Sequence, residues 1–138
     1  MAFDDINVLS TLRQALGYHN ARQRVLAENV ANVNTPGFTP GEISQGQFER
    51  VLNGQASASS GGLRVTDPRH FSGGTAGSSA AYRTEQRPDS ETTVNGNSVV
   101  IEEQMVRANE NRMKYETALS LYQKSLNMIR LAGRPPGQ

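Results

Sequence analysis

One short stretch of the 138-residue sequence carries the residue types that acyl-transfer catalysis uses. Asp67, Arg69, His70 and Ser72 lie close together and supply a carboxylate, a cation, a general base and a hydroxyl. Acyl transfer is the class of reaction that this cluster would serve. Neighbouring positions in a Gly-rich stretch do not create a triad, however, and a polar turn anchored by His70 explains the same residues. We therefore expect the chain not to be an enzyme.

The composition argues against most other kinds of site. With no Cys and only two His, the chain has no thiolate zinc site and too few His for a catalytic zinc centre. No Gly-rich phosphate loop followed by Lys and Ser or Thr is present. Fourteen Lys and Arg against 13 Asp and Glu give no basic field for nucleic acid. We expect no cofactor, no metal, no small-molecule substrate and no nucleic-acid partner.

Apolar residues are concentrated near the two ends of the chain, in two patterns that step alternately by three and four residues. The first consists of Leu9, Leu12, Leu16, His19, Gln23, Leu26, Val30 and Val33. The second consists of Ile101, Met105, Ala108, Arg112, Tyr115, Leu119, Tyr122, Leu126 and Ile129. This spacing is typical of a coiled-coil seam. It predicts a mainly α protein in which helices over 1–35 and 98–132 pack antiparallel as a coiled-coil-like inner domain.

Local signals suggest where these helices begin and end. Asp4 or Asp5 can cap the first helix, and Pro36 disfavours helical backbone at the residue before it. The second helix is preceded by a turn and cap over 95–98 and followed by Gly133. Between them, residues 36–97 form an extended segment rich in Gly and Ser. We expect it to be irregular, with one small β-hairpin from the runs 63–66 and 81–84.

The second helix carries more apolar residues than one seam can bury. A second apolar strip, away from the seam, consists of Val106, Met113, Leu121 and Met128. Tyr18 and Val25 form a weaker counterpart on the first helix. Exposed apolar strips usually mark protein interfaces, so we favour assembly with other subunits. The alternative is that the middle segment folds back and covers the strip.

The seams also contain polar residues. Antiparallel pairing through the seam centres brings His19 and Gln23 close to Arg112 and Tyr115. Our hypothesis is that His19, Gln23 and Arg112 form a polar layer that fixes the register of the helices. Alternatively, the helix axes diverge there and each polar group reaches solvent.

A distinctive motif follows the first helix. It runs from Ala27 to Phe38 and includes Asn29, Asn32, Asn34, Thr35, Pro36, Gly37 and Phe38. Asn side chains can hydrogen-bond the backbone groups that become free where a helix unwinds. Pro followed by Gly suits a tight turn. The motif therefore predicts a helix-terminating elbow with a Phe anchor.

This motif resembles the Asn-rich signature of the flagellar basal-body rod and hook proteins. The stretch 96–105, the run 108–111 and Tyr115 resemble the proximal-rod members of that family, and 66–71 resembles the Thr-x-Pro-x-His segment in its middle. The Gly/Ser insertions and the Arg-Pro-Pro-Gly-Gln tail depart from the pattern. The resemblance covers both predicted helices and part of the middle segment. It implies a structural subunit of the proximal rod that assembles helically through its terminal helices, transmits torque and lines part of the export channel.

The resemblance also implies partners and a location. The partners would be further copies of the chain, the adaptor that joins the rod to the membrane ring, other proximal-rod proteins and the flagellar export apparatus. The location would be the basal body on the periplasmic side of the inner membrane, reached without a cleaved signal peptide. A different rod protein of the family and a free coiled-coil adaptor are the alternatives. A peptidoglycan hydrolase is the enzymatic alternative, since a rod must cross peptidoglycan.

Overall fold

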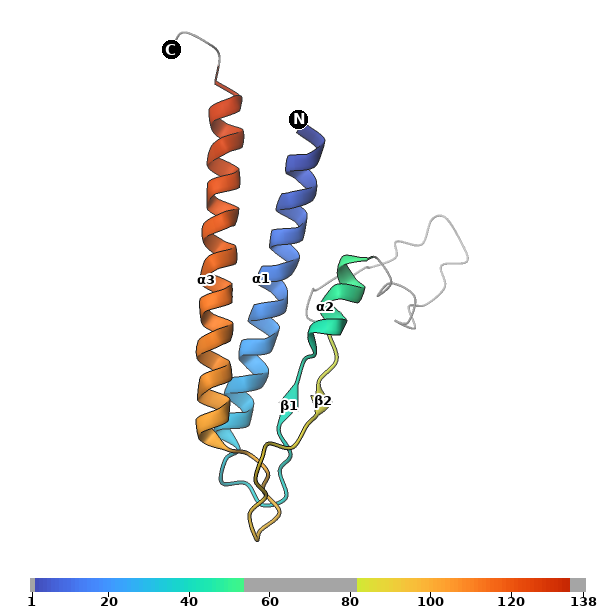
Figure 1. Ribbon diagram of the computed structural model, residues 1–138, viewed down its shortest axis with the longest axis vertical. Helices are drawn as coiled ribbons and strands as arrows, with labels where there is room; N and C mark the ends of the chain where they lie inside the picture. The colour runs from blue at the N-terminus through green and yellow to red at the C-terminus, as the bar shows by residue number, and fades with distance from the viewer. Residues whose placement is uncertain (1, 54–81, 135–138) are drawn as a thin grey trace, which may run out of the picture.

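The computed structural model describes residues 2–53 and 82–134. Its elements, in chain order, are helix α1 (Ala2–Ala31), strand β1 (Gly41–Glu42), helix α2 (Gln45–Leu52), strand β2 (Glu85–Gln86) and helix α3 (Ile101–Ala132) (Figure 1). The prediction of a mainly α fold with two long terminal helices and one small antiparallel sheet is confirmed. Among the described helices, none is both long and apolar enough to cross a membrane.

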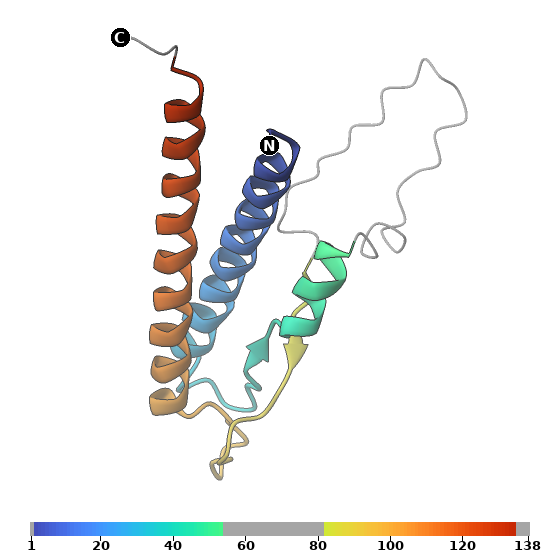
Figure 2. The ribbon, with the colours of Figure 1, turned by 45° about the horizontal axis from the view of Figure 1, so that its top comes forward.

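The two long helices run antiparallel, and both chain ends lie at the same end of the molecule (Figure 1). They lie close together where α1 ends and α3 begins, and they diverge toward the termini, as Figure 2 shows from a second direction. We call the first of these the closed end, formed by residues 32–40 and 88–106, and the other the open end. All of the interhelical hydrogen bonds described below lie between the closed end and the middle of the helix pair.

The helix boundaries differ from the predicted ones. α1 ends at Ala31 rather than near Pro36, and Asp4 and Asp5 lie inside α1 instead of capping it. α3 begins at Ile101, with Val100 as its N-cap, and therefore starts after the expected cap at 95–98. Its end at Gly133 agrees with the prediction, since the N–H of Gly133 donates to the carbonyl of Ile129 at 3.0 Å.

The middle segment contributes a second layer that sequence patterns did not predict. α2 and the two strands cover one side of α1, where Tyr18 and Val25 are buried against Ile43 and Tyr82. The Tyr18 ring also stacks on Phe48, with ring centroids 5.0 Å apart. Tyr18 and Val25 are thus core residues and not an exposed strip. On this face the middle segment folds back and covers the apolar side chains. This is the alternative to subunit assembly that we did not favour.

The small sheet lies elsewhere than expected. Gly41 pairs with Gln86 and Glu42 with Glu85, whereas the run 63–66 and residue 81 lie outside the described residues. Gly41 must be glycine because a Cβ at this position would collide with the side chain of Thr84. The close approach lets β1 lie flat against α1 and β2.

The face that α3 turns toward α1 matches the predicted seam only in part. Its buried residues are Gln104, Asn111 and Ala118, none of which the prediction placed in the seam. The predicted seam residues Ala108, Tyr115 and Tyr122 are half-buried. The predicted seam residues Ile101, Met105, Arg112 and Ile129 are exposed, so placing them between the helices was wrong. On α1 the prediction fares better, because Leu9, Leu12, Leu16, Leu26 and Val30 are all half-buried or buried. Leu119 and Leu126 are half-buried at the edge of the interface, and Val33, also half-buried, lies in the turn after α1.

Candidate functional site

The Asn-rich motif joins three elements at the closed end. Asn29 is almost fully buried, and its amide NH₂ donates to the Gly41 carbonyl at 2.8 Å and to Oε1 of Gln104 at 2.9 Å. Its Oδ1 accepts from the Gly41 N–H at 2.9 Å. Asn29 therefore gives β1 the two hydrogen bonds that a neighbouring strand would give, and it also bonds to α3.

The turn after α1 is closed by backbone hydrogen bonds and reinforced by side chains. Asn97, from the segment before α3, donates its amide to the carbonyls of Asn32 at 2.9 Å and Thr35 at 2.6 Å. Thr35 in turn donates to Oδ1 of Asn32. The carbonyls of Asn32 and Thr35 also accept the backbone N–H groups of Thr35 and Phe38, so Asn97 adds side-chain bonds to a turn that the backbone already closes.

The remaining motif residues shape the loop. Gly37 has φ +72°, a conformation that favours glycine, and its N–H donates to the Asn95 carbonyl at 3.1 Å. The carbonyl of Phe38, a half-buried residue, accepts from the Ser98 N–H at 3.0 Å. Asn34 and Pro36 are exposed. The motif thus forms an elbow whose two sides are the segments after α1 and before α3.

Asp89 caps α3 from a distant part of the chain. Its carboxylate accepts from the N–H of Val100 at 2.8 Å, from Nε2 of Gln104 at 2.8 Å and from the Arg107 guanidinium at 2.9 Å. The side chain is completely buried. A buried carboxylate at a helix N-terminus is stabilised both by the free N–H groups and by the helix dipole.

A chain of charges continues from Asp89 across the molecule. Arg107 lies 3.9 Å from the Glu42 carboxylate, and Glu42 forms a 2.9 Å ion pair with Arg22 of α1. Gln104, Asp89 and Arg107 were not among the residues that sequence patterns singled out. Together with Asn29 and Glu42 they form what we call the polar junction, which joins α1, β1 and α3.

A polar layer does lie between the helices, but its α3 member is Asn111. The Asn111 amide donates to the His19 carbonyl at 2.8 Å and to Oε1 of Gln23 at 3.0 Å. Its Oδ1 lies 2.8 Å from Nδ1 of His19, so Nδ1 must carry the proton. Arg112 is not part of the layer, because its guanidinium pairs with Glu116 on the exposed side of α3.

Burial lowers the pKa of His19 below its usual 6.5, and the nearby charges of Arg22 and Lys114 lower it further, while the hydrogen bond that its Nδ1–H donates to Asn111 acts in the opposite direction. The folded chain then binds this proton less tightly than the unfolded chain. Protonation of His19 should therefore not affect the free energy of unfolding above pH 6.5, and it should lower this free energy as the pH falls below that value. Urea unfolding at pH 7.5 and pH 5.5 measures the decline. We expect this loss of unfolding free energy to be smaller in His19→Gln than in His70→Gln. Equal pH dependence in the two variants would contradict the assignment to His19.

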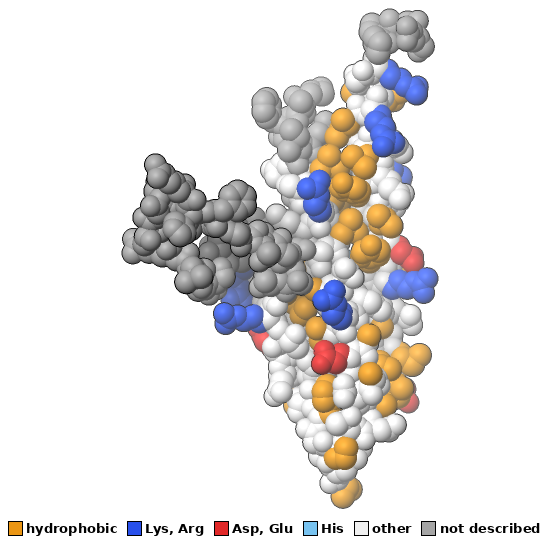
Figure 3. Space-filling view, turned by 180° about the vertical axis from the view of Figure 1, so that it is seen from behind, with side chains coloured by type: hydrophobic (Ala, Val, Ile, Leu, Met, Phe, Trp, Pro, Cys, Tyr) orange, Lys and Arg blue, Asp and Glu red, His pale blue; other side chains and the backbone are white. Residues whose placement is uncertain are grey.

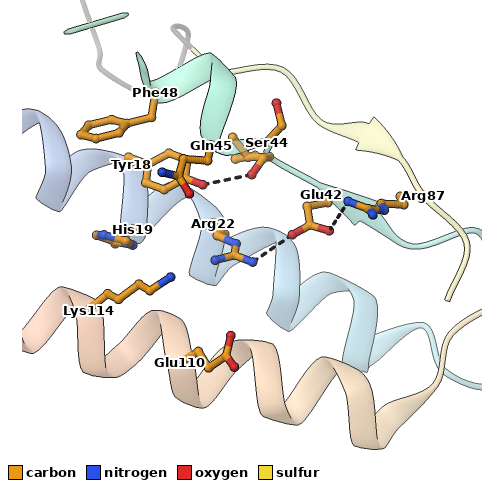
Figure 4. A pocket seen from close by; sticks show the side chains of 11 residues that line it. Tyr18, His19, Arg22, Glu42, Ser44, Gln45, Phe48, Arg87, Glu110 and Lys114 are labelled. Atoms are coloured by element: carbon orange, nitrogen blue, oxygen red, sulfur yellow. Dashed lines mark hydrogen bonds and ion pairs between the residues drawn. The ribbon is translucent and has the colours of Figure 1, made fainter. Parts of the chain in front are cut away.

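A pocket of about 450 Å³ lies between α1, the start of α2 and α3 (Figure 4). Several of its charged groups pair with one another. The Glu42 carboxylate lies 2.9 Å from the guanidinium of Arg22 and 4.0 Å from that of Arg87. The side chains of His19, Glu110 and Lys114 also point toward it (Figure 4). Within the described ranges, no three metal-ligating side chains are grouped to hold an ion. The cluster Asp67, Arg69, His70 and Ser72 lies outside the described residues.

The outer side of α3 is apolar over much of its length. The four residues of the second apolar strip, Val106, Met113, Leu121 and Met128, are between 47% and 64% exposed. Figure 3 shows hydrophobic side chains extending along this face between separate Lys and Arg side chains. Met113 and Leu121 also border a groove of about 640 Å³ that reaches Leu12 of α1. No described part of the chain covers this surface.

Comparison with known proteins shows the family to which the chain belongs. Residues 9–39, which contain most of α1 and the Asn-rich motif, match a family described as "Flagella basal body rod protein". The flagellar basal body rod protein FlgB of Agrobacterium fabrum is 32% identical over 112 residues, which are 80% of this chain and 80% of that relative. The chain belongs to the flagellar basal body rod protein family.

Further FlgB proteins show the same extent of similarity. The Yersinia enterocolitica FlgB is 30% identical over 79% of this chain and 80% of its own length. The FlgB of Cereibacter sphaeroides strain ATCC 17029 is 30% identical over 86% of this chain and 88% of its own length. The chain is thus a FlgB-like rod protein, and its family is one of structural proteins rather than enzymes. For a rod protein, the unpartnered strip of α3 is a surface available to other subunits.

Proposed function

We propose that this rod protein is a structural subunit of the proximal flagellar rod and that it joins neighbouring subunits through the second apolar strip of α3. The strip is the observation that carries the proposal, because exposed contiguous apolar surface is costly in a protein that acts alone. The described parts of the middle segment, residues 36–53 and 82–97, cover one side of α1 and do not cover the strip. The burial that α3 lacks would come from other subunits.

The polar junction supports the same function in a different way. Its hydrogen bonds hold the elbow between the helix pair and the middle segment at one angle. A subunit that transmits torque must keep this angle under load, and buried hydrogen-bonded groups resist a change of geometry more than apolar contacts do. We propose residues 1–35 and 98–132 as the inner, assembling unit and 36–97 as the outer one.

The expected partners and location follow from the family. We propose that the chain contacts other proximal-rod proteins, further copies of itself and the adaptor below the rod, after passing through the flagellar export apparatus to the periplasmic side of the inner membrane without a cleaved signal. A free coiled-coil adaptor is less well supported, because the helices diverge at the open end instead of forming a complete coiled coil (Figure 2).

Complementation of a strain that lacks the gene tests the role of the strip. We expect Met113→Glu with Leu121→Glu to abolish swimming, because two carboxylates would have to be buried in the subunit contact. The purified variant should unfold at the same urea concentration as the unmodified chain, since both positions are exposed. Swimming in soft agar and recovery of the chain in purified basal bodies are the measurements.

A matched control adds the same charge at exposed positions outside the strip. Asn109 of α3 and Gln45 of α2 are exposed polar residues. Asn109→Glu with Gln45→Glu should leave swimming unchanged. If the strip variant swims as well as this control, α3 does not assemble through the strip.

A further inference from the structure

The narrow tip of the closed end is a tightly held turn. The Thr93 N–H donates to the Asn97 carbonyl at 2.8 Å, and the Gly96 N–H donates to the Thr93 carbonyl at 2.9 Å. Asn97 then ties the turn to the end of α1 through the two amide bonds described above. Gly96, with φ +80°, packs against the backbone of Gly37. The turn therefore has one defined shape before any partner arrives.

This turn presents an apolar side chain to solvent. Val94 is fully exposed, with a relative accessibility of 109%, whereas Val99, a few residues later, is buried. Figure 1 places this loop at the far end of the molecule from the two termini. A preordered apolar knob loses little conformational entropy on binding, which favours its use as a contact.

The two ends of the molecule differ in charge. At the closed end, Asp89 is buried and both Asp89 and Glu103 pair with Arg107. Glu91 and Glu102 are the exposed acids of residues 88–106 that form no ion pair within the described residues. Residues 117–134, which we call the basic helix end, contain Lys124, Arg130 and Arg134 but neither Asp nor Glu. The first turns of α1, which include Asp4 and Asp5, diverge from the basic helix end (Figure 2). Exposed apolar residues, Leu121, Met128 and Leu131, accompany the basic ones.

We propose that the closed end of this chain docks, through Val94 and the carboxylates of Glu91 and Glu102, onto the basic helix end of an adjoining rod subunit with the same helix-pair architecture. The inference rests on the proposed function as a rod subunit. Acidic and basic ends attract, while two closed ends would repel each other. Subunits stacked this way share one polarity, and a head-to-tail contact does not close on itself but continues along an axis.

Photo-crosslinking in assembled rods tests the contact directly. A benzophenone amino acid is placed at position 94 in swimming cells, and the adduct in purified basal bodies is mapped by mass spectrometry. We expect it to join a peptide from the C-terminal helix of a rod subunit, in a stretch with Lys or Arg and no acid. An adduct elsewhere, or none, overturns the proposal. The same probe at Gln45, exposed on α2, is the control, and capture of the same peptide from that site at equal yield would also overturn it.

The charge requirement has its own test. Glu91→Lys with Glu102→Lys should lower the yield of the position-94 adduct several-fold. The matched change Glu28→Lys with Glu49→Lys, at two exposed glutamates outside both the closed end and the basic helix end, should not. Equal yields in the two variants would overturn the electrostatic part of the proposal.

Unmodified basal bodies provide a measurement that does not depend on any variant folding. A water-soluble carbodiimide should link Glu91 or Glu102 to a lysine of a C-terminal helix, and links from these glutamates only to other segments would refute the contact. Absence of the chain from purified basal bodies would instead contradict the proposed function. Presence of the chain with adducts at other sites contradicts only this inference.

Discussion

Replacement of Asp89 with alanine should destabilise the chain by about 3–5 kcal/mol, the usual cost of removing one partner from a buried ion pair. The change takes away the acceptor of three donors, namely the Val100 N–H, the Gln104 amide and the Arg107 guanidinium. It also removes the only side chain that caps the first turn of α3 within the described residues. Urea unfolding followed by far-UV circular dichroism at neutral pH measures the loss.

The neighbouring residue Glu91 provides the control. It carries the same charge two positions later but is exposed, so Glu91→Ala should change the free energy of unfolding by less than about 0.5 kcal/mol. A similar effect of the two substitutions would show that Asp89 acts through overall charge and not through its buried contacts.

Asn29→Ala is expected to cost about 3 kcal/mol, because it leaves the Gly41 N–H, the Gly41 carbonyl and Oε1 of Gln104 without their partner in a buried site. The loss should appear both as a lower unfolding midpoint in urea and as faster amide exchange at Gly41. Exchange at Gly41 distinguishes local loosening of β1 from a general loss of helix stability.

Asn34→Ala serves as the comparison, since Asn34 belongs to the same motif but is exposed. We expect it to be nearly neutral for stability. If Asn29→Ala were equally neutral, the polar junction would contribute nothing to stability, and the elbow would owe its shape to the turn residues alone.

The long helices and the elbow could be predicted because their signals are local. Heptad spacing identifies a helix from its own residues, and the Asn-Thr-Pro-Gly run indicates a turn in the same way. The elbow was expected to arise from Asn side chains bonding nearby backbone, and Asn32 does donate to the Glu28 carbonyl. The longer-range bond from Asn29 to Gly41 depends on the position of β1. The residues near Asn29 in the sequence do not indicate that position.

Part of the seam of α3 was misplaced because its buried residues are not the most apolar ones. Gln104 and Asn111 are buried because they find hydrogen-bond partners on α1 and at Asp89. Met105 and Arg112, one position later, are exposed. Apolar periodicity identifies surfaces that are buried either within the chain or against other subunits. In a subunit that assembles, some of the apolar residues are therefore exposed in the single chain.

α2 and Asp89 were missed for different reasons. α2 is short, and its one buried residue is Gln47, whose amide bonds the backbone of Arg83 at 2.7 and 2.8 Å, so it carries little hydrophobic pattern. Asp89 caps a helix that begins 12 positions later, beyond the range of a local capping signal. Both act through contacts with residues distant in sequence.

The divergence of α1 and α3 has a consequence for how the molecule comes apart. Between the closed end and the middle of the pair, separating α1 from α3 breaks the hydrogen bonds of Gln104 and Asn111 to α1. Near the termini it breaks mainly apolar contacts between half-buried residues. Opening should therefore begin at the termini and proceed toward the elbow, with each further turn harder to release than the last. The spacing of the two helices at the open end could therefore change on contact with a partner, while the hydrogen bonds of the closed end keep the elbow in place.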